Sequence, residues 1–105
     1  MNRAKATFFL PVLDNDGRDL TAEHEVVRDA VYDLCDGWTF LGFVDGAFRM
    51  ADGTKVVDKN AAYMVVIDEN RIGELEEVLR RFRARTLQEA VYLEIQRGVD
   101  FRFLN

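Results

Sequence analysis

The sequence is poor in the residue types on which most small hydrolases, redox proteins and disulfide-rich domains depend. Its 105 residues include one cysteine, one histidine and one proline. A single cysteine cannot form an internal disulfide bond, and this usage is typical of the reducing cytoplasm. Common nucleophilic and acid–base chemistry has few available groups here. We therefore predict a cytoplasmic protein without evident catalytic machinery, and the sequence implies no cofactor.

Long apolar runs and a surplus of positive charge are also missing. The uninterrupted apolar stretches fall far short of the roughly 18 residues that a membrane-spanning helix requires, and the one near the N-terminus is broken by Pro11. The formal net charge is −5, with the acidic excess confined to residues 1–68. Neutralising nucleic-acid phosphates requires clustered lysine and arginine. We therefore expect neither a membrane nor a nucleic acid as a partner.

Bulky core material, in contrast, is plentiful. Eight Phe, three Tyr and one Trp contribute to an apolar fraction of 49%. A chain of this length suits one domain with one modest hydrophobic core. Residues 1–105 are therefore predicted to form a single α+β domain.

Aromatic and β-branched segments predict several strands. Pro11 cannot donate to a hydrogen-bond ladder, so we expect it near a strand end or on an edge strand. Turns are expected at Asp45-Gly46, at residues 58–60 and at Arg97-Gly98. The strands are predicted over residues 5–13, 38–44, 61–68, 88–96 and 99–104, with a short hairpin over residues 47–57.

Residues 88–96 are open to two interpretations. Val91, Leu93 and Ile95 alternate with polar residues as in a strand, but the segment also fits a continued helix. We favour the strand because the following Arg97-Gly98 turn leads into a second alternating run, which predicts a terminal hairpin.

Two amphipathic helices are predicted, over residues 22–35 and 71–84. Thr21 is a candidate N-cap of the first helix. In the second, glutamates precede arginines, an order that complements the helix dipole and allows pairs such as Glu77–Arg81.

This order of elements predicts a ferredoxin-like β-α-β-(hairpin)-β-α-β-β sandwich, with a mostly antiparallel sheet and both helices on one face. In the most apolar strand, Tyr63, Val65 and Ile67 point one way, and Met64 and Val66 point the other. The second apolar side requires cover from a partner subunit or from a folded-over hairpin. We therefore predict a homo-oligomer that associates through a sheet face.

An aromatic set marks the expected contact surface. These side chains could stack a flat ligand, but without interleaved Lys or Arg they favour a core or an interface. The predicted interface residues are Trp38, Phe40, Phe43, Phe48 and Tyr63.

The acidic segment LDNDGRDL at residues 13–20 resembles part of a calcium loop. With Gly17 at the sixth position of such a loop, Asp14 and Asp16 occupy the third and fifth, but Val12 occupies the first. Asx residues favour turns through local hydrogen bonds, so a turn is the favoured interpretation. As an alternative function, turn carboxylates could converge on a metal ion in a metal-dependent enzyme. The candidate ligands are Asp14, Asp16, Asp45 and Asp58.

Three further features carry weaker signals. The run RRFRAR is the only basic cluster, so an anion or nucleotide site remains an alternative, although these arginines also suit a solvated helix end. His24 is interpreted as a surface residue, and Cys35 as a core or boundary residue. The candidate anion-binding residues are Arg80, Arg81, Arg83 and Arg85.

Four short patterns together suggest a resemblance. They are F-x-L-P-x-x-D-N-x-G at residues 8–17, G-W-T at 37–39, V-D-G-A-F at 44–48 and Y-M-V-V at 63–66. The chain resembles a family of small uncharacterised prokaryotic α+β proteins over most of its length. The resemblance implies no activity and no functional residue. A self-assembling or partner-binding module is thus the favoured function.

Overall fold

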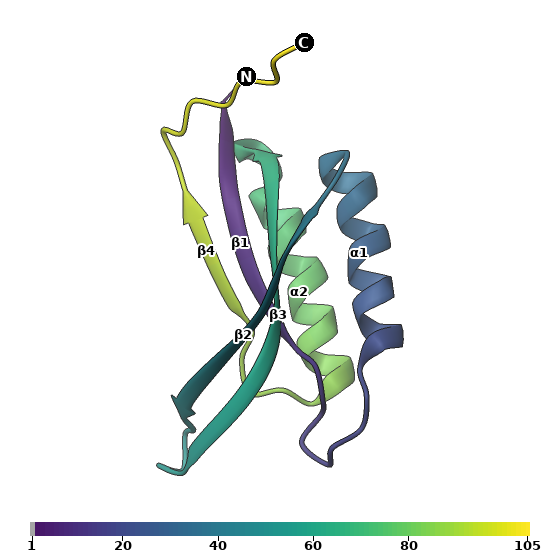
Figure 1. Ribbon diagram of the computed structural model, residues 1–105, viewed down its shortest axis with the longest axis vertical. Coiled ribbons are helices and arrows are strands. Elements are labelled where there is room, and N and C mark those ends of the chain that lie inside the picture. The colour runs from purple at the N-terminus through teal and green to yellow at the C-terminus, as the bar shows by residue number, and fades with distance from the viewer. Residues whose placement is uncertain (1) are drawn as a thin grey trace.

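The computed structural model describes residues 2–105 and has the element order βαββαβ (Figure 1). The elements are β1 (Arg3–Pro11), α1 (Thr21–Cys35), β2 (Thr39–Arg49), β3 (Lys55–Asp68), the short 3-10 helix η1 (Glu69–Arg71), α2 (Ile72–Thr86) and β4 (Tyr92–Gln96).

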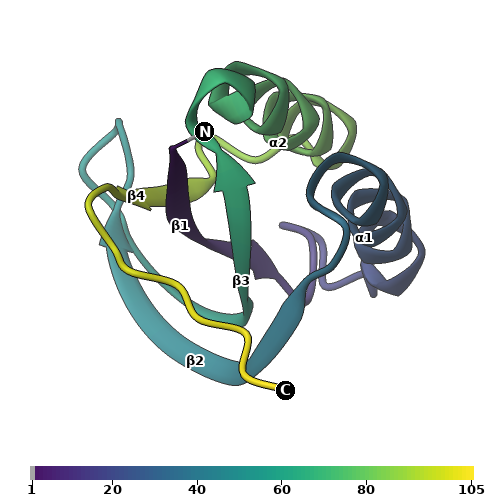
Figure 2. The same cartoon turned by 90° about the horizontal axis from the view of Figure 1, so that it is seen from above.

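The strands form one antiparallel sheet in the order β2-β3-β1-β4. Both helices cover the same face of this sheet, and the other face carries no helix (Figure 2). The predicted ferredoxin-like α+β architecture is confirmed. Pro11 is the last residue of β1, so it ends a central strand without interrupting the ladder.

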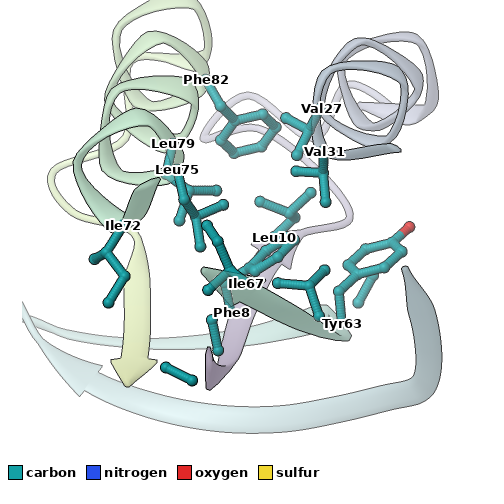
Figure 3. Close-up of a cluster of buried hydrophobic side chains, with 14 of the residues drawn as sticks. Phe8, Leu10, Val27, Val31, Tyr63, Ile67, Ile72, Leu75, Leu79 and Phe82 are labelled. Atoms are coloured by element: carbon teal, nitrogen blue, oxygen red, sulfur yellow. The ribbon is translucent and has the colours of Figure 1, made fainter. Parts of the chain in front are cut away.

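The hydrophobic core lies between the sheet and the helices (Figure 3). Alternate residues of β1 and β3 face the helices, because side chains alternate along a strand. Tyr63, Val65 and Ile67 are buried on this side, as their alternation predicted. The largest fully buried side chains include Phe8 and Leu10 from β1, Val27 and Val31 from α1, and Leu75 and Phe82 from α2.

The second face of the sheet is only partly covered. Met64 and Val66 are half-buried there. The segment after β4 crosses this side near the start of β1 (Figure 2). Its Phe103 lines a cleft together with Met64 and Val66. The chain therefore covers part of its own second apolar face.

Strands β2 and β3 are more continuous than the sequence predicted. The expected turn at Asp45-Gly46 and the expected break at residues 58–60 are wrong, because both segments are paired within the β2–β3 ladder. Asp45 lies opposite Lys59, and opposite charges on facing strands favour pairing. The local turn preference of Asp and Gly is thus overridden by the ladder.

The hairpin turn itself falls within the predicted segment. It occupies residues 50–54, where the Met50 and Thr54 backbones are hydrogen-bonded and Gly53 has a φ of +89°. This left-handed conformation favours glycine. The β2–β3 hairpin therefore forms a long arm that extends beyond the helical layer (Figure 1).

The C-terminal part contains one strand where a hairpin was predicted. Residues 92–96 form β4, so the strand interpretation of 88–96 is confirmed there and the helical alternative is wrong. The predicted strand over residues 99–104 is absent. Its apolar residues instead pack across the end of the sheet, where Val99 and Phe101 line a cleft with Asn2 and Arg3. The alternating apolar residues of this segment pack against the end of the sheet and form no hydrogen-bonded ladder with another strand of the described chain.

The helices lie close to their predicted positions. The N-cap of α1 is Leu20, not Thr21, and the Thr21 N–H donates to Asp19 Oδ1 at 2.7 Å. Hydrogen bonding with the Thr21 side chain, together with this backbone hydrogen bond, lowers the pKa of the Asp19 carboxyl. Within residues 2–105, neither helix is long and apolar enough to cross a membrane.

His24 is buried, so its interpretation as a surface residue is wrong. The side chain is 7% exposed and packs 5.9 Å from the Phe82 ring. Its Nε2–H donates to the carbonyl oxygen of Pro11 at 2.7 Å. Burial lowers the pKa of His24 below its ordinary value, an effect that this hydrogen bond partly opposes. The neutral imidazole thus ties the first turn of α1 to the end of β1.

We expect this histidine to make the protein less stable in acid. Because its pKa is lower in the folded than in the unfolded state, the unfolded chain binds the proton first as the pH falls below about 6.5. The free energy of unfolding should therefore fall from pH 7.5 to pH 5. Urea titrations at both values should show a larger loss for the native chain than for His24→Leu. Equal losses would contradict the assignment.

Candidate functional site

An apolar patch lies along β2 on the surface of the protein. We define the β2 patch as Trp38, Phe40, Leu41 and Phe43, all of which are exposed, Phe43 by 63%. Phe40 contacts Phe43 with ring centroids 5.2 Å apart in an edge arrangement. Contiguous exposed apolar groups of this kind mark contact sites, whereas single exposed residues do not.

Tyr63 anchors the β2 patch to the core. It is 2% exposed, and its ring centroid lies 5.7 Å from that of Trp38 and 5.6 Å from that of Phe40. Cross-strand pairing explains this arrangement, because Phe40 lies opposite Tyr63 in the β2–β3 ladder. The patch is therefore held on a rigid element of the fold.

Arg28 from α1 fixes the inner border of the patch. Its Nη1 donates to the Tyr63 hydroxyl at 3.1 Å, and its guanidinium carbon lies 5.6 Å from the centroid of the Trp38 ring. The second contact is a cation–π interaction. Arg28 has no local sequence signal for this role, because only the packing of α1 against β2 and β3 brings it to these rings.

The strand that carries the patch is an edge strand. β2 pairs with β3 along one side only, so its outer backbone groups have no ladder partner within the described sheet. Leu41 is 54% exposed and sits in a bulge between Phe40 and Gly42. Proteins commonly protect such edges with Lys or Pro, and residues 39–44 contain no charge and no proline.

The five predicted interface residues divide into two groups. The structure brings Trp38, Phe40, Phe43 and Tyr63 together. Phe48 lies apart on the opposite face of the sheet, because it pairs with Val56 and therefore alternates away from Phe43. The bulge at Leu41 could not be recognised from the sequence.

The candidate metal ligands lie in separate parts of the fold. Asp14 Oδ1 accepts the N–H groups of Asp16 and Arg18 at 2.9 and 2.8 Å, which is an Asx-type turn. Asp45 and Asp58 belong to facing strands but point to opposite faces of the sheet. Within residues 2–105, no three His, Cys, Asp or Glu side chains gather closely enough to hold a metal ion.

The candidate anion-binding arginines already have partners. Arg80 pairs with Glu76 at 3.4 Å, as expected for helix neighbours, and Arg81 pairs with Glu77 at 3.3 Å. Arg85 Nε lies 2.6 Å from Glu23 Oε2 and thereby links α2 to α1. Arg83 donates to the carbonyl oxygen of Gln88 at 3.4 Å. Acceptors within the same chain therefore already pair with much of the positive charge of this arginine cluster.

Cys35 lies at the boundary of the core, as predicted. It is half-buried at the end of α1 and packs against the hydrophobic core. Burial raises the pKa of its thiol to about 11. The thiol is therefore protonated at neutral pH, which does not suit a nucleophile.

Known structures share the fold of this chain. No protein-family model and no curated protein matches the sequence. The chain is similar to a phage SAM lyase in complex with S-methyl-5'-thioadenosine, with a TM-score of 0.70 and 19% identity over 91% of this chain and 81% of that one. It is also similar to the divalent cation tolerance protein CutA1 of Thermus thermophilus, with a TM-score of 0.70 and 12% identity over 95% of this chain and 87% of that one.

A third similar structure is a Bacillus cereus protein related to NIF3. The TM-score is 0.67 and the identity 14%, over 94% of this chain and 26% of that one. At these identities the three likenesses show the fold alone. They agree with a small ferredoxin-like α+β protein and leave its activity open.

Proposed function

We propose that this protein is a self-assembling module whose copies associate through the edge of β2 and the β2 patch. The observation that carries the proposal is the combination of an open strand edge with four exposed apolar side chains beside it. An open edge offers backbone donors and acceptors to another strand, and the patch adds apolar area to the same contact.

A second copy of the chain is the favoured occupant. Every copy carries its own open edges at β2 and β4, so a complementary strand is always present at equal concentration. Residues 39–44 are uncharged, and copies can therefore approach along this stretch without like-charge repulsion. A heterologous partner remains the alternative outcome of the experiments below.

The metal and anion alternatives have less support. CutA1 is named for divalent cation tolerance, but the carboxylates of this chain lie in separate places and three of the four arginines are paired with glutamates. The patch, in contrast, has no role inside the chain that explains its exposure. We also propose a cytoplasmic location, because the only cysteine is unpaired.

The apparent mass of a charged patch variant tests this proposal. Phe43→Glu places a carboxylate in the contact without altering the core, since this ring is largely exposed. We expect the native chain to form oligomers whose mass falls on dilution, and Phe43→Glu to be monomeric at the same concentrations. Light scattering over a wide concentration range, with and without EDTA, measures both; an EDTA-insensitive mass separates patch contacts from metal bridging.

The matched control is Val26→Glu, which adds the same charge to an exposed apolar position on α1. Val26 is half exposed and belongs neither to the hydrophobic core nor to the β2 patch, so the control should assemble as the native chain does. A native chain that stays monomeric at every concentration would refute self-assembly and leave a heterologous partner as the alternative. Loss of assembly in both variants would show that general charge, and not the patch, controls association.

A further inference from the structure

A further cleft lies under the hairpin arm, on the sheet face opposite the helices. The turn of the arm reaches the loop that precedes β4, where the Ala51 N–H donates to Glu89 Oε1 at 2.8 Å. Figure 2 shows the arm curving around the sheet toward β4. The partly open space beneath the arm, which we call the arm cleft, has a volume of about 290 Å³. Its lining includes Phe9, Phe48, Asp58, Asn60 and Tyr92.

Aromatic rings form the walls of the arm cleft. Phe9 and Tyr92 stack with their centroids 4.6 Å apart and their planes 17° apart. On the arm, the Phe48 ring lies over Gly46 so closely that a Cβ added to this glycine would be 2.7 Å from the ring. Glycine at this position therefore lets the ring lie flat along the strand beside the cleft.

Asn60 supplies the observation that points to a ligand. It is only 6% exposed and lines the cleft, and its side-chain amide makes no hydrogen bond within residues 2–105. No unpaired side-chain N or O atom of the described residues is sealed from solvent, so this amide opens into the cleft. The amide donors and acceptor of Asn60 are therefore available to a molecule that enters the cleft.

The charges around the arm cleft restrict the class of ligand. Asp58 and Glu89 lie on its lining with Arg49, which leaves an excess of acceptors and no cationic cluster for a phosphate. An Asn amide offers one acceptor and donors in one plane, a pattern that matches the adjacent amine and ring nitrogen of adenine. The volume suits a single heterocycle better than a nucleotide.

We propose that the arm cleft binds a neutral, planar purine-type heterocycle, as a free base or nucleoside. The aromatic walls supply stacking surface, the Asn60 amide reads the donor–acceptor edge of the ring, and Asp58 accepts from an exocyclic amine. All of these groups belong to one chain, so the proposal does not depend on self-assembly.

Titration of the native chain with adenosine tests the inference. We expect saturable binding by calorimetry and a rise in melting temperature, since a ligand that binds only the folded state stabilises it. AMP should bind more weakly than adenosine because of the acidic lining. Asn60→Leu should weaken adenosine binding at least tenfold, as each lost pair of edge contacts is large. The matched control Asn70→Leu, at an exposed position in η1, should bind as the native chain does.

Two further variants keep the test decisive. Gly46→Ala should displace the Phe48 ring and weaken binding, and Asp58→Asn should weaken adenosine more than inosine, which lacks the exocyclic amine. Phe43→Glu should retain binding, which separates this site from the assembly surface. The proposal is overturned if the native chain shows no saturable binding of adenosine, adenine or guanosine at millimolar concentration. Unchanged affinity in a folded Asn60→Leu would overturn it equally.

Discussion

Replacing Tyr63 with alanine is expected to lower the free energy of unfolding by about 3–5 kcal/mol, the range for removing a large buried aromatic ring. Tyr63 is almost fully buried in β3 and contacts Phe8, Trp38 and Phe40. The substitution removes a core side chain and also the support of the β2 patch. This variant should therefore lose both stability and assembly.

Tyr63→Phe separates these two contributions. It keeps the ring and removes only the hydroxyl that accepts a hydrogen bond from Arg28. We expect a loss of about 1 kcal/mol, which is typical of one hydrogen bond. Urea unfolding at a fixed protein concentration measures the free energy, and the fluorescence of Trp38, the only tryptophan, reports on the patch. Equal losses in Tyr63→Ala and Tyr63→Phe would contradict the role assigned to the ring.

Phe82→Ala is the second substitution with a large expected effect. Phe82 is fully buried on α2, in the core beside Val27 of α1 (Figure 3). Its ring also lies 5.9 Å from that of His24. Removing the ring leaves a cavity that the helices cannot close, at a cost of about 3–5 kcal/mol. For a domain whose total stability is typically about 5–15 kcal/mol, this is a large fraction.

The control for this experiment is Phe103→Ala, at an exposed position in the segment after β4. It should change the free energy of unfolding by less than about 0.5 kcal/mol, because little of its surface is removed from water. Comparable losses in both variants would show that the C-terminal segment, and not the core alone, carries much of the stability.

Element type could be predicted from the sequence where periodicity was strong. The alternation in residues 61–68 identified the central strand and its two sides, and the glutamate-to-arginine order of α2 predicted its ion pairs. Local turn preferences gave wrong predictions where strand pairing stabilises an extended conformation more strongly. Asp45-Gly46 favours a turn in isolation, but within the ladder Asp45 faces Lys59. The cross-strand partner decides such positions, and it is distant in sequence.

The candidate sites show the same limit. The aromatic residues of the β2 patch were recognisable from the sequence, but the separation of Phe48 from them depends on the strand register. Arg28 and Asn60 gave no local signal. Arg28 gains its role because α1 packs beside Trp38, and Asn60 gains its role because the arm curves over it.

Residue order was enough to establish the fold class, the two helices and the central strands, because short-range periodicity records which side of each element avoids water. Folding in three dimensions settled which strands became edges, which aromatic rings met and where a buried amide faces a cleft. Those properties depend on strand order and on the curvature of the hairpin, which arise from contacts between residues far apart along the chain.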